Sequence, residues 1–133
     1  MAESTTTYVA IVDDDDSVCR SLGRLLRAAG IQPVAYPSAE AFLADAKRPK
    51  FDCLMLDVQL GGMSGIELAR RLNAVGSTTP VVFVTAHNEA AIREEAARTH
   101  CTAYLVKSDP AETVLAAIRR AVTEGPPSRR TSG

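Results

Sequence analysis

Short apolar runs alternate with amphipathic stretches along most of the chain. Five of these runs are rich in β-branched or large apolar residues and have the length of buried strands. They cover residues 8–12, 31–36, 53–56, 81–84 and 104–106. The run 53–56 has no polar alternation, which is typical of a central strand covered on both faces.

The stretches between these runs carry apolar residues at helical spacing. In the first of them, Val18, Leu22 and Leu25 recur on one face, and Gly30 then supplies a C-terminal stop. Residues 89–99 also have a helical composition, but they contain few large apolar anchors. We therefore expect a well-packed first helix and a weakly anchored fourth helix.

Polar residues that cap helices stand where helices should begin. Ser38 predicts the start of a brief second helix, and Ser64 with Glu67 has the spacing of a capping box before the third. Asp109 and Pro110 predict the N-cap and the first position of the last helix.

Five strand–helix units in strict alternation predict an α/β domain with a parallel sheet and right-handed crossovers. We expect one folded domain over residues 1–123. Residues 124–133 are rich in Gly, Pro, Ser and Arg and lack an apolar anchor. This end is predicted to be a disordered tail or the start of a linker.

Composition narrows the class of protein. The 133 residues suffice for one domain, and a net charge of −1 gives no indication of nucleic acid or of an anionic membrane as a partner. No apolar run approaches the roughly 20 residues that span a bilayer. Residues 1–7 lack the pattern of a signal peptide. We expect a soluble, cytoplasmic protein whose Cys19, Cys53 and Cys101 act as small hydrophobic residues.

Candidate chemistry lies where the predicted strands end. Asp13 and Asp14 follow the first strand, Asp57 follows the third, Thr85 the fourth and Lys107 the fifth. In open parallel sheets, ligands bind outside the carboxyl ends of the strands, where the strand order reverses. We therefore expect the three aspartates to converge there, with the threonine and the lysine approaching from the neighbouring strands.

Such a cluster of acids needs a counter-charge. Two carboxylates 4 Å apart repel by about 4 kcal/mol at an effective dielectric constant of about 20, so three together require a cation or a proton. Oxygen ligands without Cys or His favour Mg²⁺, Mn²⁺ or Ca²⁺ over Zn²⁺, and a partial cage suits Mg²⁺. With the repulsion offset, Asp57 could act as a nucleophile toward a phosphoryl group. Lys107 would supply a charge for the phosphoryl oxygens and Thr85 a hydroxyl donor.

Segments from all parts of the domain, taken in order, resemble the receiver domains of two-component response regulators. The segments are residues 11–14, the apolar run into Asp57, and residues 62–68, 84–86 and 104–107. The resemblance covers residues 8–123, and residues 36–43 are most similar to receivers of the nitrogen-fixation and quorum-sensing (LuxR-type) regulators. It implies a flavodoxin-like (βα)5 three-layer sandwich with strand order 2-1-3-4-5. It also implies a signalling phosphoacceptor in transcription regulation, which catalyses only its own phosphorylation and dephosphorylation.

The resemblance also implies residue roles. Asp57 would be the phosphoacceptor, and Lys107 would contact the phosphoryl group. Mg²⁺, or Mn²⁺ in its place, would bind Asp13, Asp14, Asp57 and the backbone carbonyl of Gln59. A histidine kinase or a histidine phosphotransfer protein would donate the phosphoryl group.

Further implied roles concern signalling output. Thr85 and Tyr104 would form the switch, and Gln59 and His87 would tune the lifetime of the phosphoryl group. The surface that responds would be the fourth helix, fifth strand and fifth helix, and the fourth helix and fifth strand could also support a homodimer. No direct contact of this segment with nucleic acid or membrane is implied.

The chain departs from the family pattern at several positions. Ser108 replaces a proline that normally follows the lysine in a cis bond, and we predict a trans bond because a non-proline cis peptide costs about 3 kcal/mol. Gly61 stands where a proline is usual and predicts a looser loop. His100 replaces a helix-terminating glycine, and histidine tolerates positive φ better than most residues. Asp15 and Asp16 extend the acidic run and are expected as a helix cap and a first-turn residue rather than as ligands.

Two alternative functions remain open. A Mg²⁺-dependent phosphatase could use Asp57 as its nucleophile, but such enzymes carry a second aspartate two residues later, and here that residue is Gln59. A pseudo-receiver would keep the fold as an interaction module without being phosphorylated. The intact acidic set counts against it, while Ser108 and the glycine-rich loop keep this alternative open.

Overall fold

Each apolar run forms a strand, and each amphipathic stretch forms a helix. The computed structural model describes residues 6–125. The strands are β1 (Tyr8–Val12), β2 (Gln32–Tyr36), β3 (Cys53–Leu56), β4 (Val81–Thr85) and β5 (Ala103–Val106). The helices are α1 (Asp16–Ala28), α2 (Ala39–Ala44), α3 (Gly65–Ala74), α4 (Ala90–Ala97) and α5 (Ala111–Glu124).

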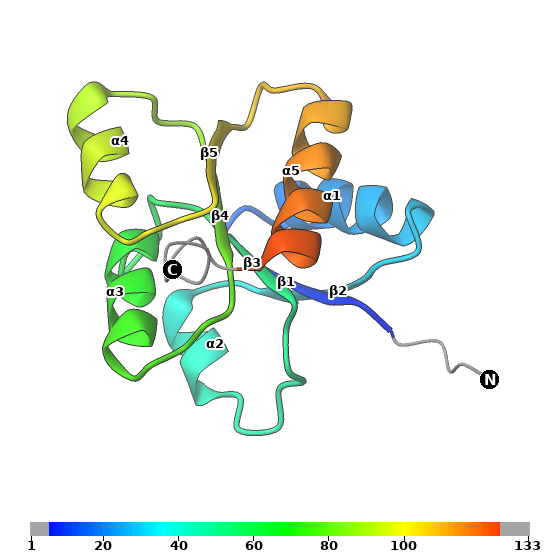
Figure 1. Cartoon of the computed structure of the whole chain (residues 1–133), viewed down its shortest axis with the longest axis horizontal. Helices are drawn as coiled ribbons and strands as arrows, with labels where there is room; N and C mark the ends of the chain where they lie inside the picture. The colour runs from blue at the N-terminus through cyan, green and yellow to red at the C-terminus, as the bar shows by residue number, and fades with distance from the viewer. Residues whose placement is uncertain (1–5, 126–133) are drawn as a thin grey trace.

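The strands form one parallel sheet in the order β2-β1-β3-β4-β5. Helices α1 and α5 cover one face, and α2, α3 and α4 cover the other (Figure 1). The predicted flavodoxin-like three-layer fold and its strand order are therefore confirmed. Val12 lies in register with Tyr36 on one side and Leu56 on the other, so the carboxyl ends of β1 and β3 are neighbours.

The two faces of the sheet bury separate apolar clusters. In β3, Leu54 and Leu56 belong to the cluster under α2, α3 and α4, whereas Cys53 and Met55 belong to the cluster under α1 and α5. This alternation follows from the two-residue period of a strand, and it explains why a central strand has no polar position. Burial also raises the pKa of the Cys53 thiol to about 12, so it behaves as a small hydrophobic residue.

Most of the predicted helix caps are formed. The Asp15 carboxylate accepts hydrogen bonds from the N–H groups of Ser17 and Val18 and caps α1, while Asp16 lies in its first turn. The hydroxyls of Ser38 and Ser64 cap α2 and α3 in the same way. Since the Asp15 carboxylate is bound to the helix terminus, the acidic run divides into site residues and cap residues.

The predicted start of the last helix is wrong by one residue. Pro110, not Asp109, is the N-cap of α5, and Ala111 is the first helical residue. The Asp109 carboxylate instead accepts a hydrogen bond from the Val106 N–H at 3.0 Å. An aspartate side chain can bind a nearby backbone N–H in a turn as readily as it caps a helix, and here it closes the turn after β5.

Helix α5 extends to Glu124, one residue beyond the predicted end of the domain. The predicted tail falls mostly on residues 126–133, which lie outside the described part of the chain. Within the described part, no helix is long and apolar enough to cross a bilayer.

An aromatic cluster closes the core beside α2. Tyr36 packs edge-on against Phe42 and Phe51, with ring centroids 5.3 and 6.2 Å away, and its hydroxyl donates to the Asp45 carboxylate at 2.7 Å. Burial, together with the hydrogen bond to Asp45 and its negative charge, raises the pKa of Tyr36 to about 12. The folded protein therefore holds this phenolic proton more tightly than the unfolded chain does.

This difference predicts a pH dependence of stability. Between the unfolded pKa of about 10 and the folded pKa, the native state binds more protons, so its free energy of unfolding should fall as the pH rises. Urea unfolding at pH 9 and pH 11 measures the decrease. In Tyr36→Phe the decrease should be smaller, because the titrating group is absent. An equal decrease in both proteins would show that other groups cause it.

Candidate functional site

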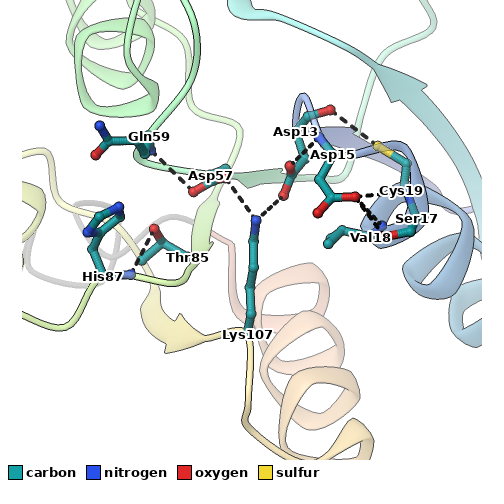
Figure 2. A network of polar contacts seen from close by, with 10 residues as sticks. All are labelled: Asp13, Asp15, Ser17, Val18, Cys19, Asp57, Gln59, Thr85, His87 and Lys107. Carbon is teal, nitrogen blue, oxygen red and sulfur yellow. Dashed lines mark hydrogen bonds and ion pairs between the residues drawn. The ribbon is translucent and has the colours of Figure 1, made fainter.

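The site lies at the carboxyl ends of β1, β3, β4 and β5, where the strand order reverses. Asp13 follows β1, Asp57 follows β3, Thr85 ends β4 and Lys107 follows β5. Figure 2 shows the lysine side chain reaching between the two aspartates. The sequence therefore predicted correctly that Asp13, Asp57 and Lys107 converge.

Lys107 joins the two buried acids. Its Nζ lies 3.0 Å from Oδ2 of Asp13 and 3.0 Å from Oδ2 of Asp57. The two aspartates are only 4% and 5% exposed. Because buried carboxylates are stable only when paired, one ammonium group here serves two of them. The contact with Asp13 was not anticipated from the sequence, which assigned this lysine to the phosphoryl group alone.

Burial and ion pairing shift the pKa values of these groups in opposite directions. Burial raises the pKa of Asp13 above its ordinary value, although hydrogen bonds from the Asp15 N–H and from Lys107 oppose the rise. For Lys107, burial lowers the pKa, but the hydrogen bonds to Asp57 and Asp13 outweigh it, and the net pKa is raised. The lysine is therefore cationic at neutral pH.

The donor set suits a hard divalent cation. Oxygens of Asp13, Asp14 and Asp57 lie within 4.8 Å of one another, and Asp14 is exposed to solvent. Three carboxylates against one ammonium leave an excess of negative charge at the site. Oxygen ligands that are open to water on one side fit Mg²⁺ or Mn²⁺. On both charge and ligand type, the residues fit the ion that the sequence implied.

The loop after β3 folds back on Asp57. The Gln59 N–H donates to Oδ1 of Asp57 at 3.2 Å, and the Gly65 N–H donates to the Val58 carbonyl at 3.1 Å. The Gln59 side chain is exposed. The role of its carbonyl as a metal ligand, and that of its side chain in phosphoryl lifetime, stay predictions.

The two predicted switch residues bind the same peptide segment. Oγ1 of the fully buried Thr85 accepts from the His87 N–H at 3.3 Å, and the Tyr104 hydroxyl donates to the His87 carbonyl at 2.7 Å. The Tyr104 ring is half-buried against the core, and Arg93 covers it, with its guanidinium carbon 4.8 Å from the ring centroid. Thr85 and Tyr104 are thus linked through the backbone of His87, a contact that sequence spacing did not indicate.

The imidazole of His87 lies close to Glu89. Its Nδ1 lies 3.6 Å from the Glu89 carboxylate, a pair that is ionic only when the histidine is protonated. The predicted role of this side chain in phosphoryl lifetime stays a prediction.

Two departures from the family pattern have the predicted geometry. No peptide bond among residues 6–125 is cis, so the bond before Ser108 is trans. His100 has a φ of 62°, the left-handed conformation expected where a glycine is usual. The trans bond still leaves Lys107 in contact with both aspartates.

Comparison with known proteins agrees with this geometry. The family model for the response regulator receiver domain matches residues 9–119. The chain is 32% identical over 123 residues to the response regulator protein TodT of Pseudomonas putida, covering 92% of the chain and 54% of TodT. It is 34% identical over 119 residues to the transcriptional regulatory protein FixJ of Azorhizobium caulinodans, covering 90% of the chain and 56% of FixJ. The chain thus spans about half the length of these relatives.

A solved structure supports the fold. The crystal structure of a CheY-like response regulator receiver domain protein from Methanospirillum hungatei superposes with a TM-score of 0.83. The match covers 90% of this chain and 96% of that one at 22% identity, so it bears on the fold alone.

Proposed function

The chain belongs to the response regulator receiver domain family, and on that premise we propose that Asp57 accepts a phosphoryl group in the presence of Mg²⁺. A histidine kinase or a histidine phosphotransfer protein is the proposed donor. The observation that carries this proposal is the buried Asp57 carboxylate, bound to Lys107 and within 4.8 Å of the oxygens of Asp13 and Asp14. An acid placed in this way can receive an anionic group, which an unpaired cluster of acids would repel.

In the proposed reaction, an oxygen of Asp57 forms a bond to phosphorus. The bond from phosphorus to the donor nitrogen breaks, and the nitrogen keeps the electron pair. Lys107 holds Asp57 in place and offers its ammonium to the phosphoryl oxygens. A bound Mg²⁺, held by Asp13, Asp14, Asp57 and the Gln59 carbonyl, would offset the negative charge of the carboxylates and of the phosphoryl group.

Signalling output would follow from the link through His87. A phosphoryl group that draws the Thr85 hydroxyl toward itself would disturb the His87 N–H, and the His87 carbonyl holds Tyr104. Tyr104 lies on β5, the edge strand, next to a helix α4 that buries only Ala96. A weakly anchored helix beside an edge strand is suited to respond, so α4, β5 and α5 are the proposed output surface.

Beyond the receiver itself, several assignments rest on the relatives. FixJ is named as a transcriptional regulatory protein, and we extend a role in transcription regulation to the full-length protein. A homodimer through α4 and β5, a cytoplasmic location and the lack of direct contact with nucleic acid or membrane belong to the same proposal. The protein would act as a signalling domain whose only catalysis is its own phosphorylation and dephosphorylation.

Mass spectrometry tests the central claim. Incubation with Mg²⁺ and acetyl phosphate should add the mass of one phosphoryl group, and chelation of Mg²⁺ should abolish the gain. Asp57→Asn should gain nothing. Asp16→Asn is the matched control, because Asp16 belongs to the same acidic run but lies in the first turn of α1, and it should be phosphorylated like the wild type.

The pseudo-receiver is the second candidate function, and the same experiment distinguishes it from a receiver that is phosphorylated. A wild-type protein with unchanged mass, and with no change in its amide resonances on addition of Mg²⁺ and beryllofluoride, would favour an interaction module without phosphorylation. The departure at Ser108 and the glycine-rich loop after Asp57 are the features that support this candidate.

A further inference from the structure

The loop between β3 and α3 is held at its far end by a side chain from another helix. Glu40, in the first turn of α2, accepts a hydrogen bond through its Oε2 from the Met63 N–H at 2.8 Å. The two residues are 23 positions apart. The contact therefore ties α2 to the segment that runs from Asp57 to the start of α3.

A second observation shows how closely the carboxylate approaches the loop backbone. Gly62, the residue before Met63, has a φ of +81°. A Cβ atom added there would lie 2.7 Å from Oε2 of Glu40 and 3.3 Å from its Cδ. The absence of a side chain at this position thus allows the carboxylate to lie against the backbone and reach the next N–H. The same hydrogen bond lowers the pKa of Glu40, so the group is ionised at neutral pH.

The loop held in this way carries groups of the proposed metal site. Its first residues include Gln59, whose N–H binds the Asp57 carboxylate and whose carbonyl is a proposed ligand. At its other end, the Gly65 N–H binds the Val58 carbonyl. Between these two anchors, the contact from Glu40 is a tether from outside the loop. At Gly61, next to the tethered segment, an added Cβ would meet no atom within 4 Å in the described part of the chain, apart from its two chain neighbours.

We propose that Glu40 is a positioning residue of the phosphoacceptor site. By holding the Met63 N–H, it fixes the loop so that the Gln59 carbonyl and the Asp57 carboxylate are arranged for a divalent cation. This inference rests on the proposed function, because it concerns the affinity of that same site. It predicts that the reach of the side chain to Met63 matters, and that its charge matters much less.

Another explanation for an acid at this position is the helix dipole. Negative charge in a first turn stabilises a helix, as Glu112 can do in α5. Glu40→Asp separates the two explanations, because aspartate keeps the charge but is one methylene too short to span the same distance. Glu40→Gln is its complement, since glutamine keeps the length and an acceptor oxygen but loses the charge.

The test is a titration with MgCl2 followed by the amide resonances of the loop, using the whole chain. Glu40→Ala and Glu40→Asp should both weaken Mg²⁺ binding by about tenfold, at the lower end of the effect of residues that support metal ligands. Glu40→Gln and the control Glu112→Ala should bind within about twofold of the wild type. Without metal, hydrogen exchange of the Met63 amide should be faster in the alanine and aspartate variants than in the glutamine variant.

Each contrary result has a definite meaning. Wild-type Mg²⁺ affinity in Glu40→Ala overturns the inference. So does an affinity that follows charge, in which Glu40→Asp binds Mg²⁺ like the wild type and Glu40→Gln binds it weakly. An equal loss in Glu112→Ala also overturns it, since it would point to general electrostatics. If the wild type itself binds neither Mg²⁺ nor beryllofluoride, the proposed function fails instead. Glu40→Gln with Glu40→Asp decides the question even if the alanine variant does not fold.

Discussion

Replacing Gly65 with alanine is expected to lower the free energy of unfolding by about 3 kcal/mol, at the upper end of the range for overpacking. The first residue of α3 packs directly on the strand end that carries the phosphoacceptor. A Cβ at this position would lie 2.1 Å from the backbone carbonyl oxygen of Asp57 and 2.9 Å from its carbonyl carbon. Backbone atoms cannot rotate away as a side chain can, so either α3 or the end of β3 must move.

The size of this effect is diagnostic because alanine is otherwise favoured in a helix. Helix propensity alone would make the substitution stabilising by up to about 1 kcal/mol. Any loss of stability therefore reports the clash with Asp57. Because that clash displaces the phosphoacceptor itself, we also expect the phosphorylated fraction after incubation with acetyl phosphate to fall sharply.

Gly61→Ala provides the matched control in the same loop. Apart from its two chain neighbours, no atom of residues 6–125 lies within 4 Å of its added Cβ, and its φ lies outside the left-handed region. Its free energy of unfolding should stay within about 1 kcal/mol of the wild type, because alanine at a compatible position only reduces the conformational freedom of the unfolded chain. Urea unfolding of both variants measures the contrast. Equal stabilities for the two alanine variants would contradict the steric argument at Gly65.

Some features of the fold and site follow from local sequence alone. The apolar runs predict strands because a parallel strand is buried on both faces, as the run from Cys53 to Leu56 illustrates. In a parallel sheet, the carboxyl ends of neighbouring strands then lie together at one edge. This is why the sequence alone places Asp13, Asp57 and Lys107 in one site.

Other features depend on contacts between segments that are distant in the sequence, and no periodic pattern of residues indicates such contacts. The contact between Glu40 and Met63 joins a helix to a loop, and the conformation of the loop decides whether it forms. The sequence contained one indication of the contact at Gly65, because a glycine inside a predicted helix often marks a close backbone approach. The sequence did not indicate which backbone segment Gly65 would approach. The error at Asp109 has a related origin, because an aspartate can bind several nearby N–H groups, and tertiary packing selects among them.

Lys107→Met is expected to lower the free energy of unfolding by about 2 kcal/mol when divalent ions are chelated. Breaking a buried ion pair by removing one partner typically costs about 3–5 kcal/mol. We expect less here because the site opens to water at Asp14, and the lysine side chain is itself 25% exposed. The loss arises because Asp13 and Asp57 stay buried without their shared cation.

The pH dependence of this loss follows from the sign of the shift at Asp13. Burial holds the pKa of this carboxyl above that of the unfolded chain, so the native state binds the extra proton at acidic pH. Removing the ammonium removes a contact that lowers the pKa, and the pKa should rise further. The difference in stability between Lys107→Met and the wild type should therefore shrink as the pH falls from 7 toward the raised pKa.

Divalent ions provide the complementary measurement. Since the ammonium and a divalent cation neutralise the same carboxylates, MgCl2 should raise the stability of Lys107→Met more than that of the wild type. Acceptance of a phosphoryl group should still fall, because a metal ion at the aspartates cannot take the place of the lysine at the phosphoryl oxygens. Lys47→Met, at an exposed position outside the site, should change the stability by no more than about 0.5 kcal/mol. If Mg²⁺ stabilised Lys107→Met and the wild type equally, the two cations would not share these carboxylates.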